Sequence, residues 1–326
     1  MPDTSSAHVP PSATATSVPA HVDIWPRVPL AEWQDTCATL HLWTQIVGKT
    51  RLAFAPMENH WWQAALYVTP RGLTTSSIPY GTGTFRVDFD FIDHVLTMRT
   101  SDATERAMPL IARSVADFHR EYLATLRALG VVVHLWPMPV EIAGAIPFPE
   151  DNIHASYDAD AAHRFWRALV QADRVLKQFR GRFIGKASPV HFFWGSFDLA
   201  ATRFSGRRAP AYEGSVPNVA NRVMREAYSH EEISAGFWPG GGAVSDAAFY
   251  AYAYPEPSGL SAAAIQPEGA YYHPDMREFI LPYEIVRTAP SPDETLLAFL
   301  QSTYDAAADL ARWDRPALER GPADGS

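Results

Sequence analysis

Three histidines, each next to aromatic or acidic residues, could transfer protons or bind a metal ion. His60 and His191 each open an aromatic stretch, and two glutamates follow His230. Imidazole titrates near neutral pH and is a common metal ligand, so these groups predict proton transfer or metal binding. No familiar metal-ligand spacing occurs, so a metal and any cofactor stay unknown, and ordinary core or surface histidines explain the pattern equally well. The candidate catalytic residues are His60, His191, His230 and Glu231.

Two glycine–lysine pairs form a second candidate feature. The chain has only three lysines, Lys49, Lys177 and Lys186, and the first and last of them directly follow a glycine. Because every other basic residue is arginine, a compact ammonium group at these two places favours binding of an anionic group by Lys49 and Lys186. The simpler explanation is a positive charge near the end of a helix, which stabilises the helix by about 0.3–1 kcal/mol.

Aromatic side chains near these groups could form the walls of a site. Alternation along residues 249–254 places three tyrosines on one face of a strand and small or apolar residues on the other. Such a row can hold a flat or sugar-like ligand, although aromatic residues are also common in strand cores. Trp238, beside the triplet Gly240–Gly242, could cover the site. The candidate ligand-binding residues are Lys49, Lys186, Trp62, Trp194, Trp238, Tyr250 and Tyr252.

The best-known catalytic motifs are absent from the sequence. Gly48-Lys49-Thr50 lacks the earlier glycine of a phosphate-binding loop, because Trp43 occupies that position. No His-Glu-x-x-His, Cys-x-x-Cys or Gly-x-Ser-x-Gly pattern occurs either. The sequence therefore predicts no reaction class, and whether the protein is an enzyme stays open.

The elements that must position these residues follow the same order in both halves of the chain. Apolar residues at helical spacing predict helices over 31–47 and 159–183, each followed by a Gly-Lys pair, an aromatic strand, further strands and a capped helix. In the first half the strands are expected over 61–69, 85–91, 95–100 and 131–136, and the second helix over 115–129. In the second half the strands are expected over 190–197, 228–233, 249–254 and 278–283, before a helix near Asp293.

This order predicts an α+β fold built from two related halves by internal duplication. Each half would be an α/β-meander/α unit, with mostly antiparallel sheets packed together and helices outside. The N-terminal half-repeat spans 23–136, a proline-rich connection spans 137–158, and the C-terminal half-repeat spans 159–314. Residues 1–22 and 315–326 are expected to be tails. The candidate site would lie between the halves.

Composition narrows the classes of partner. The chain of 326 residues has 36 acidic and 27 basic side chains and a formal charge of −9, which disfavours nucleic-acid binding. It has no run of about 18 apolar residues and no signal-peptide pattern, so we expect no membrane partner. A single cysteine, Cys37, fits a reducing compartment. These features predict a cytoplasmic protein of unknown oligomeric state.

Several longer segments carry a family resemblance. They include Asn59-His60-Trp61-Trp62, Phe183-Ile184-Gly185-Lys186 and the runs 40–49, 89–94, 188–198 and 235–240. Together these segments resemble an uncharacterised bacterial family, domain of unknown function 5996, over about Trp25 to Trp313. The resemblance implies a soluble bacterial protein and assigns no activity, so it transfers no catalytic residue.

Two functional hypotheses follow from these patterns. The first is a cytoplasmic small-molecule-binding protein or enzyme, whose aromatic-lined site between the halves takes a small anionic or aromatic ligand. The alternative is a non-catalytic interaction or scaffold protein, whose aromatic residues fill its cores. The first hypothesis predicts that the three histidines and the two glycine-linked lysines lie close together, and it fails in this form if they lie far apart. The second hypothesis makes no such prediction.

Overall fold

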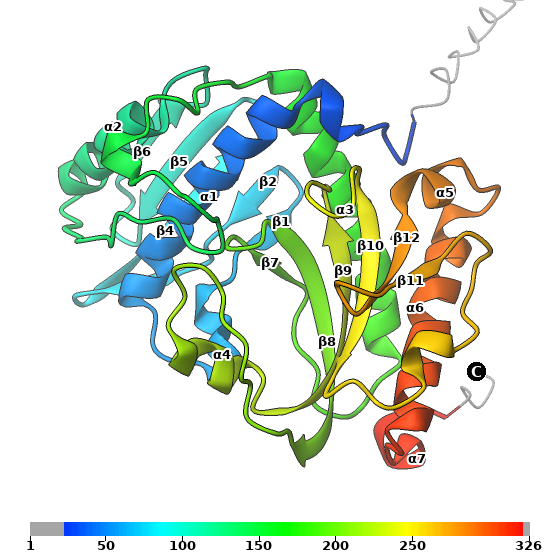
Figure 1. The fold of residues 1–326 in the computed structure, drawn as a ribbon. Helices are drawn as coiled ribbons and strands as arrows, with labels where there is room; N and C mark the ends of the chain where they lie inside the picture. The colour runs from blue at the N-terminus through cyan, green and yellow to red at the C-terminus, as the bar shows by residue number, and fades with distance from the viewer. Residues whose placement is uncertain (1–22, 322–326) are drawn as a thin grey trace, which may run out of the picture.

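Two antiparallel β-sheets, one in each half of the chain, form the frame of the protein (Figure 1). They are seen in a computed structural model that describes residues 23–321. Each sheet has six strands within the described residues. The first has the order β1-β2-β4-β5-β6, with β3 paired to β4, and the second has the order β11-β12-β10-β9-β8-β7. The predicted α+β class with antiparallel sheets is confirmed.

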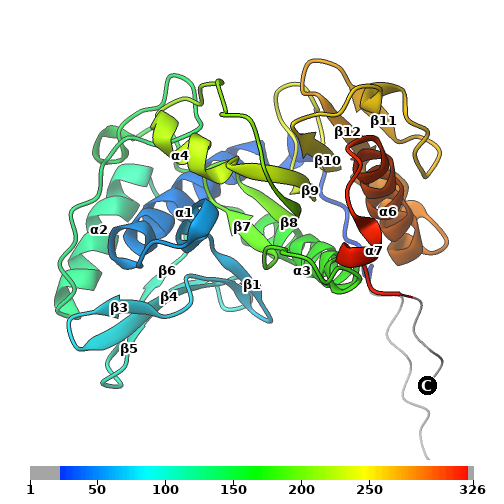
Figure 2. The same cartoon turned by 90° about the horizontal axis from the view of Figure 1, so that it is seen from below.

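In the first half, two helices cover one face of the sheet (Figure 2). They are α1 (Gln34–Phe54) and α2 (Val115–Ala128), and Ser114 caps α2 as predicted by accepting a hydrogen bond from the Asp117 amide. Phe85, Val87 and Phe89 of β4 point into the core, in agreement with the predicted alternation. The strands are β1 (Tyr67–Thr69), β2 (Gly72–Thr74), β3 (Ile78–Tyr80), β4 (Gly83–Asp90), β5 (Val95–Thr100) and β6 (Glu105–Pro109).

In the second half, α3 (Ala159–Gly181) and α6 (Pro292–Leu310) pack on one face of the sheet, and α4 (Asn221–Ala227) lies on the other side (Figure 2). The strands are β7 (His191–Phe193), β8 (Asp198–Arg208), β9 (His230–Trp238), β10 (Ala248–Tyr254), β11 (Tyr271–His273) and β12 (Glu278–Pro282). The short helices are η1 (Leu30–Glu32), η2 (Asn59–Ala64), η3 (Phe148–Glu150), η4 (Leu260–Ala262), α5 (Tyr283–Thr288) and α7 (Arg315–Leu318).

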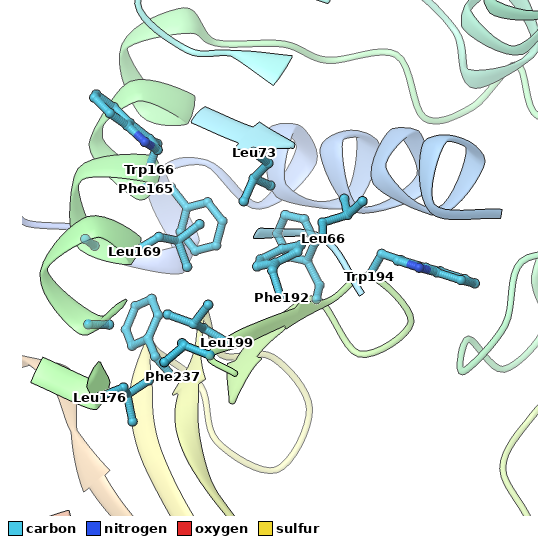
Figure 3. Packing of buried hydrophobic residues seen from close by; sticks show 14 of the residues in the cluster. Leu66, Leu73, Phe165, Trp166, Leu169, Leu176, Phe192, Trp194, Leu199 and Phe237 are labelled. Atoms are coloured by element: carbon cyan, nitrogen blue, oxygen red, sulfur yellow. The ribbon is translucent and has the colours of Figure 1, made fainter. Parts of the chain in front are cut away.

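The two halves share one hydrophobic core. Leu66, just before β1, exchanges backbone hydrogen bonds of 2.8 and 2.9 Å with Phe192 of β7, which links the edges of the two sheets. Leu199 of β8, Phe237 of β9 and Leu169 of α3 continue the same buried cluster (Figure 3). Each half runs helix, meander and helix, so the predicted two-half arrangement agrees with the structure.

Several predicted elements differ from the structure. Residues 131–136, expected to be a strand, pair with no strand of the described chain. Residues 315–318 form α7 instead of a tail, and its end is held by hydrogen bonds from the Ile184 amide to the Leu318 carbonyl and from the Arg320 amide to the Arg182 carbonyl. The C-terminal boundary at 314 is therefore too early. The predicted tail 1–22 and the final residues 322–326 lie outside the described residues.

Candidate functional site

A cavity of about 520 Å³ lies between the two halves. Its walls come from the C-terminal part of α1, from η2, from residues 134–141, from α4 and from one face of β8, β9 and β10. That face is lined by polar side chains, because alternate residues of β8 and β9 turn toward the cavity while their neighbours face α3. The cavity-facing strand residues are Asp198, Ala200, Thr202, Phe204, Glu232, Ser234, Tyr250 and Tyr252.

Lys49 reaches the cavity because α1 does not end at Gly48. The predicted stop at this glycine is wrong: α1 continues to Phe54, and Gly48 is instead a point of close contact. A Cβ atom at position 48 would lie 2.2 Å from Cδ1 of Trp194, so only glycine lets the indole pack on the helix there. The Trp194 Nε1–H donates to the carbonyl of Ala64 at 2.5 Å, which fixes the ring between α1 and η2.

The ammonium group of Lys49 is surrounded by aromatic rings. Its Nζ lies 4.7 Å from the ring centre of Trp136 and 5.9 Å from the ring centres of Phe148 and Trp194. Lys49 is 6 % exposed, and no carboxylate or other polar partner bonds to it within residues 23–321. Burial lowers the pKa of Lys49 to about 8.

His60 and Lys186 form a second polar group at the cavity. The predicted aromatic strand at this point is wrong, because η2 takes its place and holds His60 and Trp61 at φ of 58° and 62°. His60 Nδ1 lies 2.7 Å from the carbonyl of Ala227 at the end of α4, and Nε2 lies 2.7 Å from Lys186 Nζ. A carbonyl can only accept, so Nδ1 carries the proton and Nε2 accepts from the ammonium.

The charge state of His60 follows from these contacts. Burial lowers the pKa of His60, and the positive charge of Lys186 lowers it further. The imidazole is therefore neutral at neutral pH, and its Nε2 accepts a hydrogen bond from the Lys186 ammonium group. Lys186 also lies 4.8 Å from the ring centre of Phe204, which helps to fix its position over the cavity wall.

Two buried carboxyl groups face the same cavity from the second sheet. Asp198 accepts hydrogen bonds from the hydroxyls of Ser196 and Tyr250, and burial still raises its pKa. Glu232 is 6 % exposed and its side chain accepts no hydrogen bond from the described part of the chain. Burial raises the pKa of Glu232 well above the usual range, and the charge of Lys186 only partly opposes this. Burial thus favours the protonated form of Glu232, which can donate a proton.

The predicted tyrosine row is present and turned toward the cavity. Tyr250 and Tyr252 stack with ring centres 6.2 Å apart, and the Tyr252 hydroxyl lies 3.2 Å from that of Tyr228. Phe249 and Ala251 face the opposite, apolar side, as the alternation predicted. The row gives the cavity one wall of stacked rings that carry hydroxyl groups.

The structure brings together only part of the predicted site. Lining the cavity are Lys49, His60, Trp62, Trp194, Tyr250 and Tyr252, and Lys186 joins them through His60. The ring of His230 lies 5.6 Å from that of His60, but His230 is not in the cavity wall. Convergence of all three histidines on one cavity is therefore wrong.

Three predicted residues lie elsewhere. His191 is fully buried behind Trp62, with ring centres 5.5 Å apart. Glu231 points away from the cavity because it pairs with Arg207, with Oε2 and Nη2 2.6 Å apart. Trp238 does not line the cavity, and Gly240 packs against the backbone of Asp246 in its own loop.

Sequence reasoning missed several cavity residues. Glu232, rather than Glu231, is the carboxyl group in the wall, and strand alternation already places Glu232 away from its neighbour. Asp198 also lies in the wall. β8 sends the side chain of Arg203 to the opposite face, where its guanidinium group stacks 3.5 Å from the ring centre of Phe179. Residues of α4, of the turn before it and of the loop at 134–141 had no recognisable signal. These include Trp136, Glu141, Asn218, Arg222 and Val223.

No group of three or more histidine, cysteine, aspartate or glutamate side chains is arranged to hold a metal ion within residues 23–321. In the same range, every helix is too short or too polar to cross a bilayer.

Comparison with known proteins identifies the family but no activity. The sequence model of a family of unknown function (DUF5996) matches residues 25–320, nearly the whole chain. The protein therefore belongs to this family, in agreement with the sequence resemblance. No curated protein and no solved structure matches the chain.

Proposed function

For this member of a family of unknown function, we propose that it binds a small organic molecule in the cavity between its halves and transfers protons to or from it. One observation carries this proposal: a single cavity gathers aromatic walls and buried ionisable groups from both halves. Ionisable groups are costly to bury without a function, and they gather at sites where ligands or reacting atoms complete their environment.

The size and lining of the cavity indicate the class of ligand. Its volume of about 520 Å³ falls within the range of roughly 300–1,000 Å³ that is usual for small-molecule sites. Indole and phenol rings favour a ligand with a flat ring or a sugar-like face. Lys49 at one end favours an anionic or strongly polar substituent.

The ionisable groups support proton transfer. His60 is fixed with its Nε2 as the acceptor, and the Lys186 ammonium donates to it. Burial of Glu232, on a strand of the same cavity wall, favours its protonated form. A base and an acid with pKa values shifted in opposite directions are the usual components of acid–base catalysis.

We also propose that the protein works in a reducing, cytoplasmic compartment of a bacterium and that its halves arose by duplication. The buried thiol of Cys37 and the family resemblance support the first statement. The shared order of helix, antiparallel meander and helix supports the second. The net charge of −9 supports the absence of a nucleic-acid partner.

A thermal-shift screen tests the proposed function. The panel contains aromatic acids, aromatic aldehydes, sugars and sugar phosphates, since a ligand at about 100 times its Kd stabilises the folded state by about 2.7 kcal/mol. We expect one class to raise the melting temperature. Tyr252→Phe, in the cavity wall, should reduce this shift, whereas Tyr254→Phe, outside the wall, should not. A panel without any shift would instead favour the interaction or scaffold alternative.

A further inference from the structure

We propose that Lys49 is a nucleophilic lysine that forms a Schiff base with an aldehyde or ketone entering the cavity. This inference rests on the proposed function, because it assigns a substrate class to the same site. It goes further by giving Lys49 a covalent role in place of the electrostatic one that its charge alone suggests. Three features of the structure support it: the surroundings of the amine, the contrast with the other lysines, and the proton donors nearby.

The surroundings of Lys49 favour the neutral amine. Its Nζ lies among the rings of Trp136, Phe148 and Trp194, and the side chain is almost fully buried. The rings attract the ammonium form, but the loss of water around the charge outweighs them and lowers the pKa to about 8. A lysine desolvated in an apolar pocket is the usual form of an imine-forming residue.

Each of the other two lysines has a hydrogen-bond partner, although burial lowers the pKa of Lys186 as well. Lys177 Nζ lies 2.6 Å from an Asp173 carboxylate oxygen, and its side chain is 59 % exposed. Lys186 donates to His60. Lys49 is therefore the only lysine whose amine lies buried in the wall of a cavity without a hydrogen-bond partner among the described residues. The chain thus contains its own controls.

The reaction needs only the carbonyl compound and proton transfers. The lone pair of the Lys49 amine forms a bond to the carbonyl carbon, and the C=O π electrons move to oxygen. The nitrogen then loses one proton to a base and the oxygen gains one from an acid, which gives a carbinolamine. The hydroxyl group then leaves as water after protonation, and loss of the last N–H proton leaves the neutral imine. Glu232 lies in the wall of the same cavity, and burial favours its protonated form, which can supply a proton.

Reductive trapping with 4-hydroxybenzaldehyde tests the proposal. The aldehyde and sodium cyanoborohydride are added to the full-length protein at pH 7.5, and peptide mapping by mass spectrometry measures labelling of each lysine and of the N-terminal amine. We expect Lys49 to be labelled at least about tenfold faster than Lys177, because burial makes far more of its amine neutral. Labelling of Lys49 should also be faster than that of Lys186, which is not in the cavity wall and donates to His60. The labelling rate of Lys49 should reach half of its maximum near pH 8.

Variants separate the role of Lys49 from that of the cavity. Lys49→Arg keeps the positive charge and should remove the fast label. Val223→Trp, which fills the cavity from α4, should slow labelling of Lys49, whereas Arg225→Trp on the same helix but outside the cavity wall should not. Denaturation should make the three lysines react at similar rates.

Binding of 4-hydroxybenzyl alcohol, which has no carbonyl group, distinguishes two kinds of failure. If this alcohol quenches tryptophan fluorescence saturably but Lys49 is labelled no faster than Lys177, the Schiff base is wrong and the proposed binding function stands. If neither the alcohol binds nor Lys49 reacts preferentially, both proposals are wrong.

Discussion

His60 illustrates how neighbours far away in the sequence set the chemistry of one residue. Its two ring nitrogens contact the carbonyl of Ala227 and the ammonium of Lys186, which are 167 and 126 positions away along the chain. The first contact fixes the tautomer. In the second, the lone pair of Nε2 accepts a hydrogen bond from a positively charged group. An isolated histidine has neither constraint, so its sequence position alone could not reveal this role.

Removal of the Lys186 charge should raise the pKa of His60. The substitution Lys186→Met takes away a cation that disfavours the imidazolium ion, so protonation of His60 becomes easier. A titration followed by NMR of the imidazole nitrogens measures this shift. His230→Gln removes a more distant group and should change the pKa of His60 less; an equal or larger change for His230→Gln would contradict the assigned contact.

The burial of His191 leads to a prediction about the pH dependence of stability. This residue is fully buried, and both of its ring nitrogens lack partners within the described chain. Burial lowers its pKa to about 3 from an ordinary value of 6.5. Below pH 6.5 His191 therefore binds a proton in the unfolded chain but not in the folded protein. The free energy of unfolding falls as the pH falls from 6.5 toward 3.

The substitution His191→Phe should remove this penalty. We expect the free energy of unfolding to rise by about 1–2 kcal/mol at pH 7.5, since two unsatisfied polar atoms are replaced by carbon. The advantage over the wild type should grow by about 1.4 kcal/mol for each pH unit below pH 6.5. Urea denaturation at pH 7.5 and pH 5.5 measures both numbers, and a destabilised variant at pH 5.5 would show that His191 has a partner after all.

At the scale of secondary-structure elements, α1 shows where local sequence rules fail. A glycine after a run of residues at helical spacing is typical of a helix end. At Gly48, however, the helix continues for another turn and a half to Phe54. The glycine is needed because Trp194 packs on the backbone at that point. This contact places Lys49 in the cavity. A glycine in the sequence does not by itself distinguish the end of a helix from a position where another side chain packs on the helix backbone.

Substitutions at two helical glycines separate these roles. Gly48→Ala should lower the free energy of unfolding by about 1–3 kcal/mol, because the new Cβ would overlap the indole of Trp194. Gly181→Ala, at the end of α3, meets nothing within 4 Å and should be neutral or stabilising by up to about 1 kcal/mol. Equal effects in chemical denaturation would argue against the close contact at Gly48.

The strands were more predictable than the connections. Alternation correctly assigned the buried faces of β4 and β10, because successive side chains in a strand must point to opposite sides. The segment 59–64 could not be predicted in this way, since the positive φ of His60 and Trp61 is stabilised by contacts with α4 and β8. Residues 131–136 are apolar enough for a strand but find no neighbouring edge.

At the scale of the whole molecule, the site exists only where distant segments meet. The cavity combines α1 and η2 from the first half with β8, β9, β10 and α4 from the second. The sequence predicted two halves with a site between them, and the structure places a cavity there. Which side chains line that cavity was only partly predictable from the sequence. The alternating faces of β8, β9 and β10 and an irregular loop decide which side chains reach it.

Isothermal titration calorimetry with the strongest ligand from the thermal-shift screen tests the central claim, that the cavity between the halves is a small-molecule site. We predict one binding site per chain with the same affinity for the wild type and Arg225→Trp. Val223→Trp, which fills the cavity, should weaken binding at least tenfold, about 1.4 kcal/mol. Binding to Val223→Trp as tight as to Arg225→Trp would place the ligand elsewhere and contradict the account.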